Sequence, residues 1–227
     1  NRLGKSATDT INTDFGTNIN IEKVGLQFNG DIELKNIYIE DYKKDTLVSI
    51  VELNTSILSF KKLYESRLTF GDIDVIGLTL NIKTYKNEKD TNLDIFVEKF
   101  DDDNPRPPSD TKFLLSSSDI SVIDSKFTLS DENKANVKVL EFLDFNINAT
   151  DFLILGPKVK TRINQLAFRD SRGVEVKKMT TNFNFSRSSM VFDNLYINTL
   201  NSEISGDLKF KYDREDLQYF EDKVALV

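Results

Sequence analysis

The sequence predicts a mainly β protein: an elongated, curled antiparallel β-sheet (a β-taco, or repeating β-groove) with a short N-terminal helix and one short internal helix. Apolar and polar residues alternate in nearly every stretch after residue 18, as at Leu78, Leu80 and Ile82. This period of two is typical of strands with one dry face and one wet face. Similar phrases also recur at intervals of about 40–45 residues, which favours an elongated array of stacked units.

Two stretches have the period of a helix instead. In the first, apolar residues recur at four-residue spacing, and Gly16 follows as a stop signal: Leu3, Ala7, Ile11 and Phe15. The second follows Asp90 and Thr91, which are candidate N-caps, and its apolar residues have the spacing i, i+3, i+4, i+7: Leu93, Phe96, Val97 and Phe100. We expect the first helix to cover one end of the sheet, because an open sheet end presents unpaired backbone groups.

The chain divides into four segments. Residues 1–18 are the N-terminal helix and the lead into the first strand, and 19–100 are a first β-groove segment. Residues 101–112 are a loop rich in Pro and Asp, and 113–227 continue the β-groove. Strands of the same character resume after the loop. The loop is therefore either a connection emerging from one sheet or a boundary between two domains.

Local irregularities in the pattern carry further predictions. The alternation slips by one residue at Asn36–Ile37 and at Gly77–Leu78, which indicates either a β-bulge or the end of one strand and the start of the next. A recurring phrase of two alternating apolar residues ends in Asp41, Asp131 and Asp170. We expect these carboxylates to accept backbone N–H groups in turns.

The composition excludes several kinds of chemistry. The 227 residues include no cysteine and no histidine, and the formal net charge is −7. Disulfides, thiolate nucleophiles and the commonest general base are therefore missing. The nine glycines form no phosphate-binding loop, and the run Asp101–Asp103 lacks the spacing of a calcium loop. The acidic balance disfavours nucleic acid. We expect a non-enzymatic protein with no catalytic residues, no cofactor, no metal site and no nucleic-acid partner.

The sequence contains no predicted membrane helix. Its longest apolar run, Phe152–Leu155, is far shorter than the ~20 residues that a membrane helix needs. The chain starts at Asn1 and ends at Val227, just after a strand-like phrase, so we expect it to be a fragment of a longer protein.

The alternating apolar residues include many of the seventeen phenylalanines. In a single curled sheet they would form an open apolar trough, and an exposed apolar face of that size normally marks a binding site. Acyl chains suit such a trough, because each buried CH₂ gains ~0.8 kcal/mol. The candidate groove residues, which we expect to share one face, are Ile37, Ile39, Leu78, Leu80, Ile82, Phe145, Ile147, Phe183, Phe185, Leu208 and Phe210.

Three phrases carry a family resemblance: a strand from Gly30 that ends in an acidic turn at Asp41, a second strand at Leu53–Ile57, and the stretch 63–80, which ends in an apolar alternation. In this order they resemble the N-terminal region of the AsmA-like superfamily, in its TamB branch. The resemblance implies a bridge-like lipid-transfer protein that binds phospholipid in a β-groove. It also implies a periplasmic chain of a Gram-negative cell envelope, anchored in the inner membrane and reaching an Omp85-type (TamA-like) outer-membrane barrel. The family offers no catalytic residues.

Two hypotheses for the function remain open at this point. The first is a fragment of a periplasmic lipid-transfer and outer-membrane assembly protein. The alternative is a non-enzymatic β-sandwich or β-solenoid interaction module of the cell envelope, which would bind protein or glycan through its wet face. An apolar face covered by a second sheet would favour the alternative.

Overall fold

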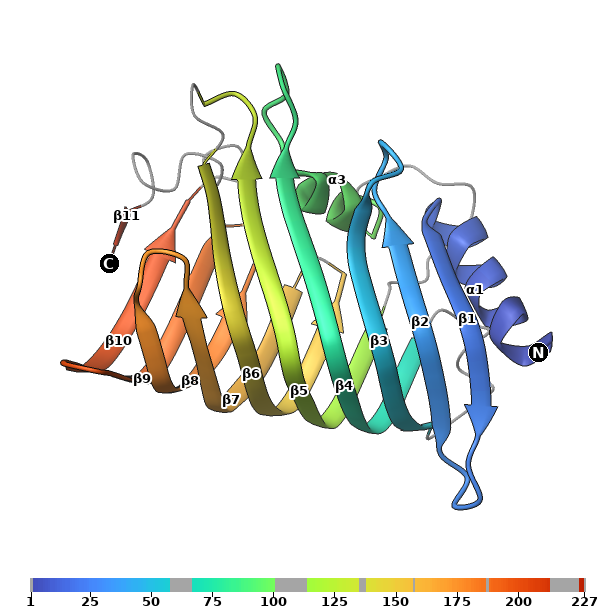
Figure 1. The fold of residues 1–227 in the computed structure, drawn as a ribbon. Coiled ribbons are helices and arrows are strands. Elements are labelled where there is room, and N and C mark those ends of the chain that lie inside the picture. The colour runs from blue at the N-terminus through green and yellow to red at the C-terminus, as the bar shows by residue number, and fades with distance from the viewer. Residues whose placement is uncertain are drawn as a thin grey trace.

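The computed structural model describes residues 2–57, 67–100, 114–134, 138–156, 158–186, 188–212 and 225–226. They form one curled sheet and two helices, α1 (Arg2–Phe15) and α3 (Asn92–Glu98) (Figure 1). Strands follow one another across the sheet in chain order. The strands are β1 (Asn18–Leu26), β2 (Ile32–Glu40), β3 (Thr46–Ile57), β4 (Arg67–Thr84), β5 (Leu114–Asp131), β6 (Lys138–Leu155), β7 (Lys158–Asp170), β8 (Glu175–Phe185), β9 (Ser189–Thr199), β10 (Glu203–Lys211) and the two-residue β11 (Ala225–Leu226).

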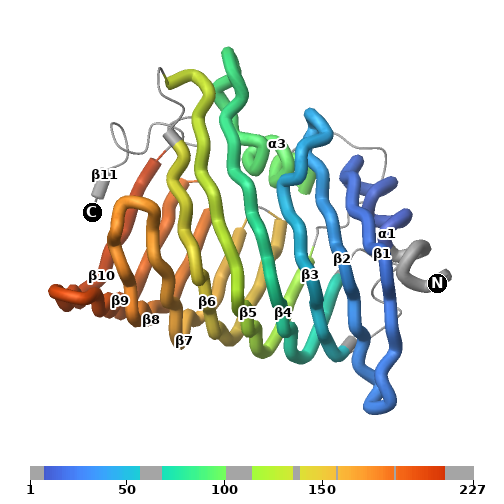
Figure 2. The backbone as a smooth tube through the Cα atoms, viewed as in Figure 1, coloured from blue at the N-terminus to red at the C-terminus, as the bar shows by residue number. Residues whose placement is uncertain are grey.

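The strands curve along their length, so the sheet is bent without closing into a barrel (Figure 2). The expected mainly β, curled sheet is therefore confirmed. One detail differs: neighbouring strands are antiparallel except β4 and β5, which run parallel. A parallel pair needs a crossover connection, and α3 lies in it. Because β4 and β5 pair directly, the segments 19–100 and 113–227 share one sheet; the loop 101–112 lies outside the described residues.

Both helices form where the apolar spacing predicts them. Residue Thr91 is the N-cap of α3: its hydroxyl accepts from the backbone N–H of Asp94, and the Asp94 side chain accepts from the Thr91 N–H. This capping box satisfies two backbone donors that have no partner inside the helix. Helix α1 ends at Phe15, and Gly16 follows with φ +61°, a conformation that glycine adopts without steric cost.

The phase slips at Asn36 and Gly77 are kinks inside continuous strands, and no strand ends there. Asn36 has φ 52° and Gly77 has φ 68°, both in the left-handed region. At each kink two residues, instead of one, separate successive apolar side chains, which then return to the same face. Gly77 is also needed for space, because a Cβ at that position would lie 2.7 Å from Cγ2 of Val51.

The three aspartates that end the recurring phrase accept backbone N–H groups, as expected. The Asp41 Oδ1 accepts from the N–H of Lys43 (2.8 Å) and of Asp45 (3.0 Å). Asp170 makes the same pair of bonds two and four residues on, both at 2.9 Å, and Asp131 accepts from the residue two positions on at 2.9 Å. Each carboxylate thus closes the turn that follows its strand.

Helix α1 covers the β1 end of the sheet. Its buried residues Ile11 and Phe15 pack against Ile19 of β1 and against apolar residues of β4, β5 and β6: Leu68, Leu115 and Ile154. One helix can reach both regions only on the concave side of the sheet. Within α1, the Asn12 amide also accepts from the Ile19 N–H (2.8 Å) and donates to the Ile19 C=O (2.9 Å), so it takes the place of a neighbouring strand at that edge residue.

Candidate functional site

The eleven candidate groove residues lie on one face of the sheet. Cross-strand pairing shows this directly, because residues opposite each other point to the same side. Ile37 lies opposite Ile50, which lies opposite Leu78. Most of the other candidates fall in similar apolar rows: Ile39 and Leu80 pair with Val48, Ile82 with Leu129, Ile147 with Val122, Phe183 and Leu208 with Phe192, and Phe185 and Phe210 with Met190. Phe145 lies opposite Ser125, which is buried on the same face. We call this side, against which α1 packs, the inner face.

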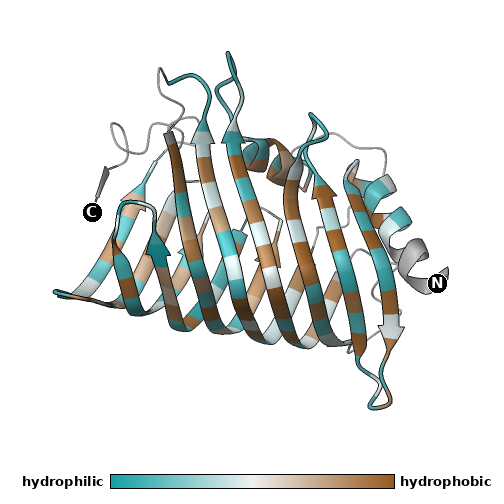
Figure 3. Ribbon diagram, viewed as in Figure 1, coloured by the Kyte–Doolittle hydropathy of each residue, from teal (hydrophilic) through white to brown (hydrophobic). Residues whose placement is uncertain are grey.

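Figure 3 shows the alternation of apolar and polar residues along the strands from which this face arises. Apolar residues occupy the inner face from β1 to β10, since Ile19 pairs with Ile39 at one end and Phe192 with Leu208 at the other. Ten strands at ~4.8 Å spacing extend this face over about 45 Å.

The inner face is only partly covered. Of the eleven candidates, Ile37 is buried, whereas the other ten keep an intermediate exposure. The described strands form one sheet, so no second sheet packs over these side chains as it would in a β-sandwich. When a sheet face is covered by a packed core, most of its large apolar side chains are buried. The partial exposure of ten such side chains therefore indicates a surface that is available to a ligand.

Aromatic rings line two parts of the inner face. The Phe142 ring lies 5.2 Å from the Phe127 ring and 5.3 Å from the Phe168 ring, measured between centroids, across β5, β6 and β7. Farther along, Phe192 lies 5.1 Å from Phe183 and 6.2 Å from Phe210, across β8, β9 and β10. These separations are typical of favourable aromatic pairs.

Hydroxyl side chains also occur on the inner face, but their donors are used within the sheet. The hydroxyl of Thr55 donates to the C=O of Asp72 at 2.7 Å. Other buried hydroxyls bond to strand carbonyls in the same way, at 2.8, 2.8, 3.0 and 2.9 Å: Ser117, Ser125, Thr161 and Thr181. A donor that is already satisfied presents mainly its methyl or methylene surface, so these residues leave the face effectively apolar.

One rim of the sheet holds a polar cluster that the sequence analysis did not identify. The Asn92 side chain is 1% exposed; it donates to Asp41 (3.0 Å) and to the Asn81 C=O (3.1 Å), and it accepts from the Lys83 N–H (2.9 Å). Asp41 also accepts from the Tyr85 hydroxyl at 2.6 Å. Because every polar group of Asn92 has a partner, the cluster fixes α3 to the ends of β2 and β4.

The charge state of this cluster follows from the same bonds. Burial acts to raise the pKa of Asp41, but hydrogen bonds from Tyr85, Asn92 and two backbone N–H groups outweigh it and leave the pKa below its ordinary value. Burial and the bonds to Asp41 and Asp45 raise the pKa of Tyr85. The centre of the cluster is therefore the ionised Asp41 carboxylate, which accepts hydrogen bonds from neutral donors. The alternating pattern of the strands gave no sign that Asn92 joins α3 to the ends of β2 and β4.

Within the described part of the chain, no three carboxylates come together in a way that could hold a metal ion. No described helix is long and apolar enough to cross a membrane. No known protein family matches the sequence, and no curated protein is similar to it.

Proposed function

We propose that this chain is a segment of a periplasmic, bridge-like lipid-transfer protein of the AsmA-like kind, which binds phospholipid acyl chains along the inner face. The inner face is the observation that carries the proposal. It is apolar over its length, its hydroxyl donors are used internally, and ten of its eleven candidate residues are partly exposed. Acyl chains need such a surface, because they gain ~0.8 kcal/mol for each CH₂ removed from water and offer no hydrogen bonds.

The cellular setting of the proposal rests on the sequence resemblance. In this setting the parent chain is anchored in the inner membrane, runs through the periplasm and contacts a TamA-like, Omp85-type barrel in the outer membrane. The single curled sheet supports the proposal that the chain is part of a longer conduit, because further strands can pair with its edge and extend the inner face in the same direction. The proposed role requires no catalytic residue.

The proposal is tested by lipid analysis of the purified 227-residue chain and of one matched pair of variants. Leu80 lies on the inner face opposite Val48 and Phe127, whereas the preceding residue, Thr79, lies on the outer face opposite Ser49 and Lys126. We expect mass spectrometry to detect phospholipid bound to the wild-type chain and to the Thr79→Asp variant. The Leu80→Asp variant should lose the lipid, because an acyl chain would have to desolvate the new carboxylate.

Circular dichroism and urea unfolding make this test decisive. On a face open to water the new carboxylate stays hydrated, so we expect Leu80→Asp to remain folded with a loss of about 1–3 kcal/mol. An unfolded Leu80→Asp variant would indicate a closed core. Either an unfolded variant, a folded variant that retains lipid, or a wild-type chain without phospholipid would contradict the proposal.

A further inference from the structure

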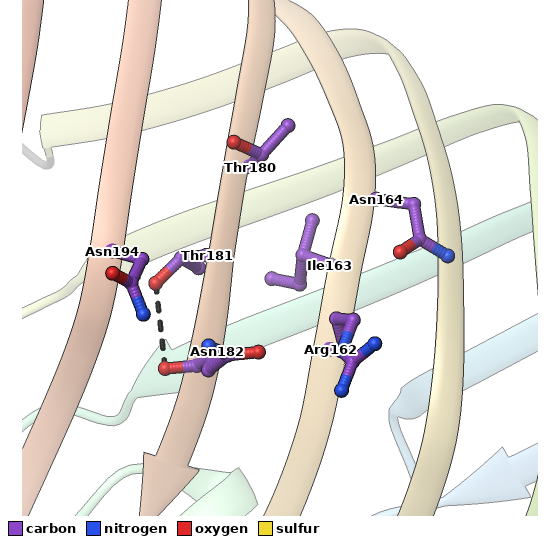
Figure 4. A pocket seen from close by; sticks show the side chains of 7 residues that line it. All are labelled: Arg162, Ile163, Asn164, Thr180, Thr181, Asn182 and Asn194. Atoms are coloured by element: carbon purple, nitrogen blue, oxygen red, sulfur yellow. Dashed lines mark hydrogen bonds between the residues drawn. The ribbon is translucent and has the colours of Figure 1, made fainter.

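The face opposite the inner one carries a hollow between β7, β8 and β9. Its volume is about 280 Å³, and its lining includes Ile163 and Thr181, whose side chains belong to the inner face. Five side chains surround it, as Figure 4 shows: Arg162, Asn164, Thr180, Asn182 and Asn194. Arg162 lies opposite Asn182, and the buried inner-face pair Ile163 and Thr181 lies beside them, so these residues belong to the outer face of the sheet.

The hollow forms because three adjacent strands are irregular at the same level. The pairing register breaks between Ile163 and Leu166 of β7, and again between Thr180 and Asn182 of β8. In β9, Asn194 has φ 52°. Such irregularities bend strands and turn side chains in new directions, and they are frequent beside binding sites.

The residue types around the hollow are unusual for strands. Asn is depleted in strands, yet carboxamides gather on the outer face of β6 to β9: Asn148, Asn164, Asn182, Asn184, Asn194 and Asn198. Amides also occur on the outer face of β2 and β3, but there they have partners, since Asn36 donates to Glu22 (2.6 Å) and Asn54 donates to Glu52 (2.8 Å).

Several polar groups at the hollow are available to a ligand. Within the described residues, the side chains of Thr180, Asn182 and Asn194 have no hydrogen-bond partner, whereas Asn164 donates to Asn148 at 3.2 Å. Carboxamides and hydroxyls both donate and accept hydrogen bonds, as sugar hydroxyls do. The nearest ion-pair partner of Arg162 is Asp151, at 4.0 Å between exposed side chains.

Charges of both signs surround the hollow, because Lys160 and Lys178 lie on the outer face of β7 and β8 and carboxylates lie beside them, so an anionic ligand has no net charge to attract it. Asp193 lies opposite Asn182, and Asp207 accepts a hydrogen bond from the Asn194 N–H at 2.6 Å. An anion in the hollow would lie close to these carboxylates and to Asp151. The volume is also slightly below the ~300–1,000 Å³ of pockets for drug-sized ligands. The lining residues are mainly of polar types but their exposed surface is mainly apolar, so the hollow suits a small molecule that has both hydroxyl groups and apolar C–H faces.

We propose that this hollow binds one sugar ring of an uncharged glycan, with Asn182, Asn194 and Thr180 bonding its hydroxyls and Arg162 donating at the rim. This site is separate from the inner face, so a lipid and a glycan could be bound together. It would attach the chain to a neutral polysaccharide surface without occupying the proposed lipid path.

Nuclear magnetic resonance titration of the ¹⁵N-labelled chain tests the proposal with two probes, maltotriose and chitotriose. We expect at least one of them to shift the side-chain amide signals of Asn182 and Asn194 and to saturate at millimolar concentration. The Asn182→Ala variant should weaken binding about tenfold, as expected for one lost hydrogen bond. The matched Asn198→Ala variant, whose amide already bonds to Glu203 at 2.9 Å, should bind like the wild type.

Three results would overturn the proposal. The first is the absence of a saturable shift with either probe, and the second is unchanged binding by a folded Asn182→Ala variant. The third is saturation of the same signals by sodium phosphate but by neither sugar, which would show an anion site instead. Lipid bound to the inner face is measured independently, so failure of this proposal is distinguishable from failure of the proposed lipid function.

Discussion

Replacement of Asn92 by alanine tests whether the rim cluster holds α3 on the sheet. The change removes three hydrogen bonds at a side chain that is 1% exposed. It leaves the Lys83 N–H and the Asn81 C=O without these partners in a part-buried place, and each such group costs about 1–3 kcal/mol. We therefore expect a loss of about 3 kcal/mol in the free energy of unfolding, which lowers Tm by about 6–12 °C for a chain of this size.

Urea and thermal unfolding followed by circular dichroism measure this loss. Asn198→Ala is the matched control, because the Asn198 amide makes an exposed bond to Glu203 and its removal should cost less than about 0.5 kcal/mol. A loss for Asn92→Ala no larger than that of the control would refute the cluster as the attachment of α3. It would also show that the cap at Thr91 and the apolar contacts of α3 suffice.

Two further predictions concern the ends and the kinks of the strands. The pKa of Asp41 is lowered in the folded chain, so its contribution to stability is present above the unfolded pKa of about 4 and is lost as pH falls through the folded pKa. Urea unfolding between pH 7 and pH 2 should show this loss, and Asp41→Asn should reduce the slope of the free energy of unfolding against pH. Gly77→Ala should cost about 1–3 kcal/mol, because Cβ would meet Val51 in a left-handed conformation, whereas Gly25→Ala, whose nearest neighbour is 3.5 Å away, should cost less than about 0.5 kcal/mol. Equal losses in the two glycine variants, or a pH slope unchanged in Asp41→Asn, would contradict these explanations.

Local pattern predicted the strands, both helices and the shared face of residues such as Ile37 and Phe183, because side-chain period reports directly on which face is dry. The kink at Gly77 was visible as a slip of phase. Strand direction was not predictable in the same way: alternation is identical for parallel and antiparallel pairs, so the parallel pairing of β4 with β5 has no local signal.

The candidate site was predictable only in its apolar part. Thr55 and Thr181 have the phase of the inner face but polar side chains, and the sequence does not show how they can be buried there: their hydroxyls bond to carbonyls of the next strand. The role of Asn92 depends on contacts with residues 11 and 51 positions away, and the hollow at Asn182 depends on three strands being irregular at one level. Such long-range coincidences leave no mark on residue spacing.

The central claim is that acyl chains lie along the inner face, and site-specific photocrosslinking tests it most directly. A photoreactive phenylalanine analogue is placed at inner-face Phe127 and Phe183, and at their outer-face neighbours Thr128 and Asn184, in cells that express the chain. We predict that phospholipid is crosslinked at both inner positions and at neither outer position. Equal crosslinking on the two faces, or no lipid at Phe127 and Phe183, would contradict the account.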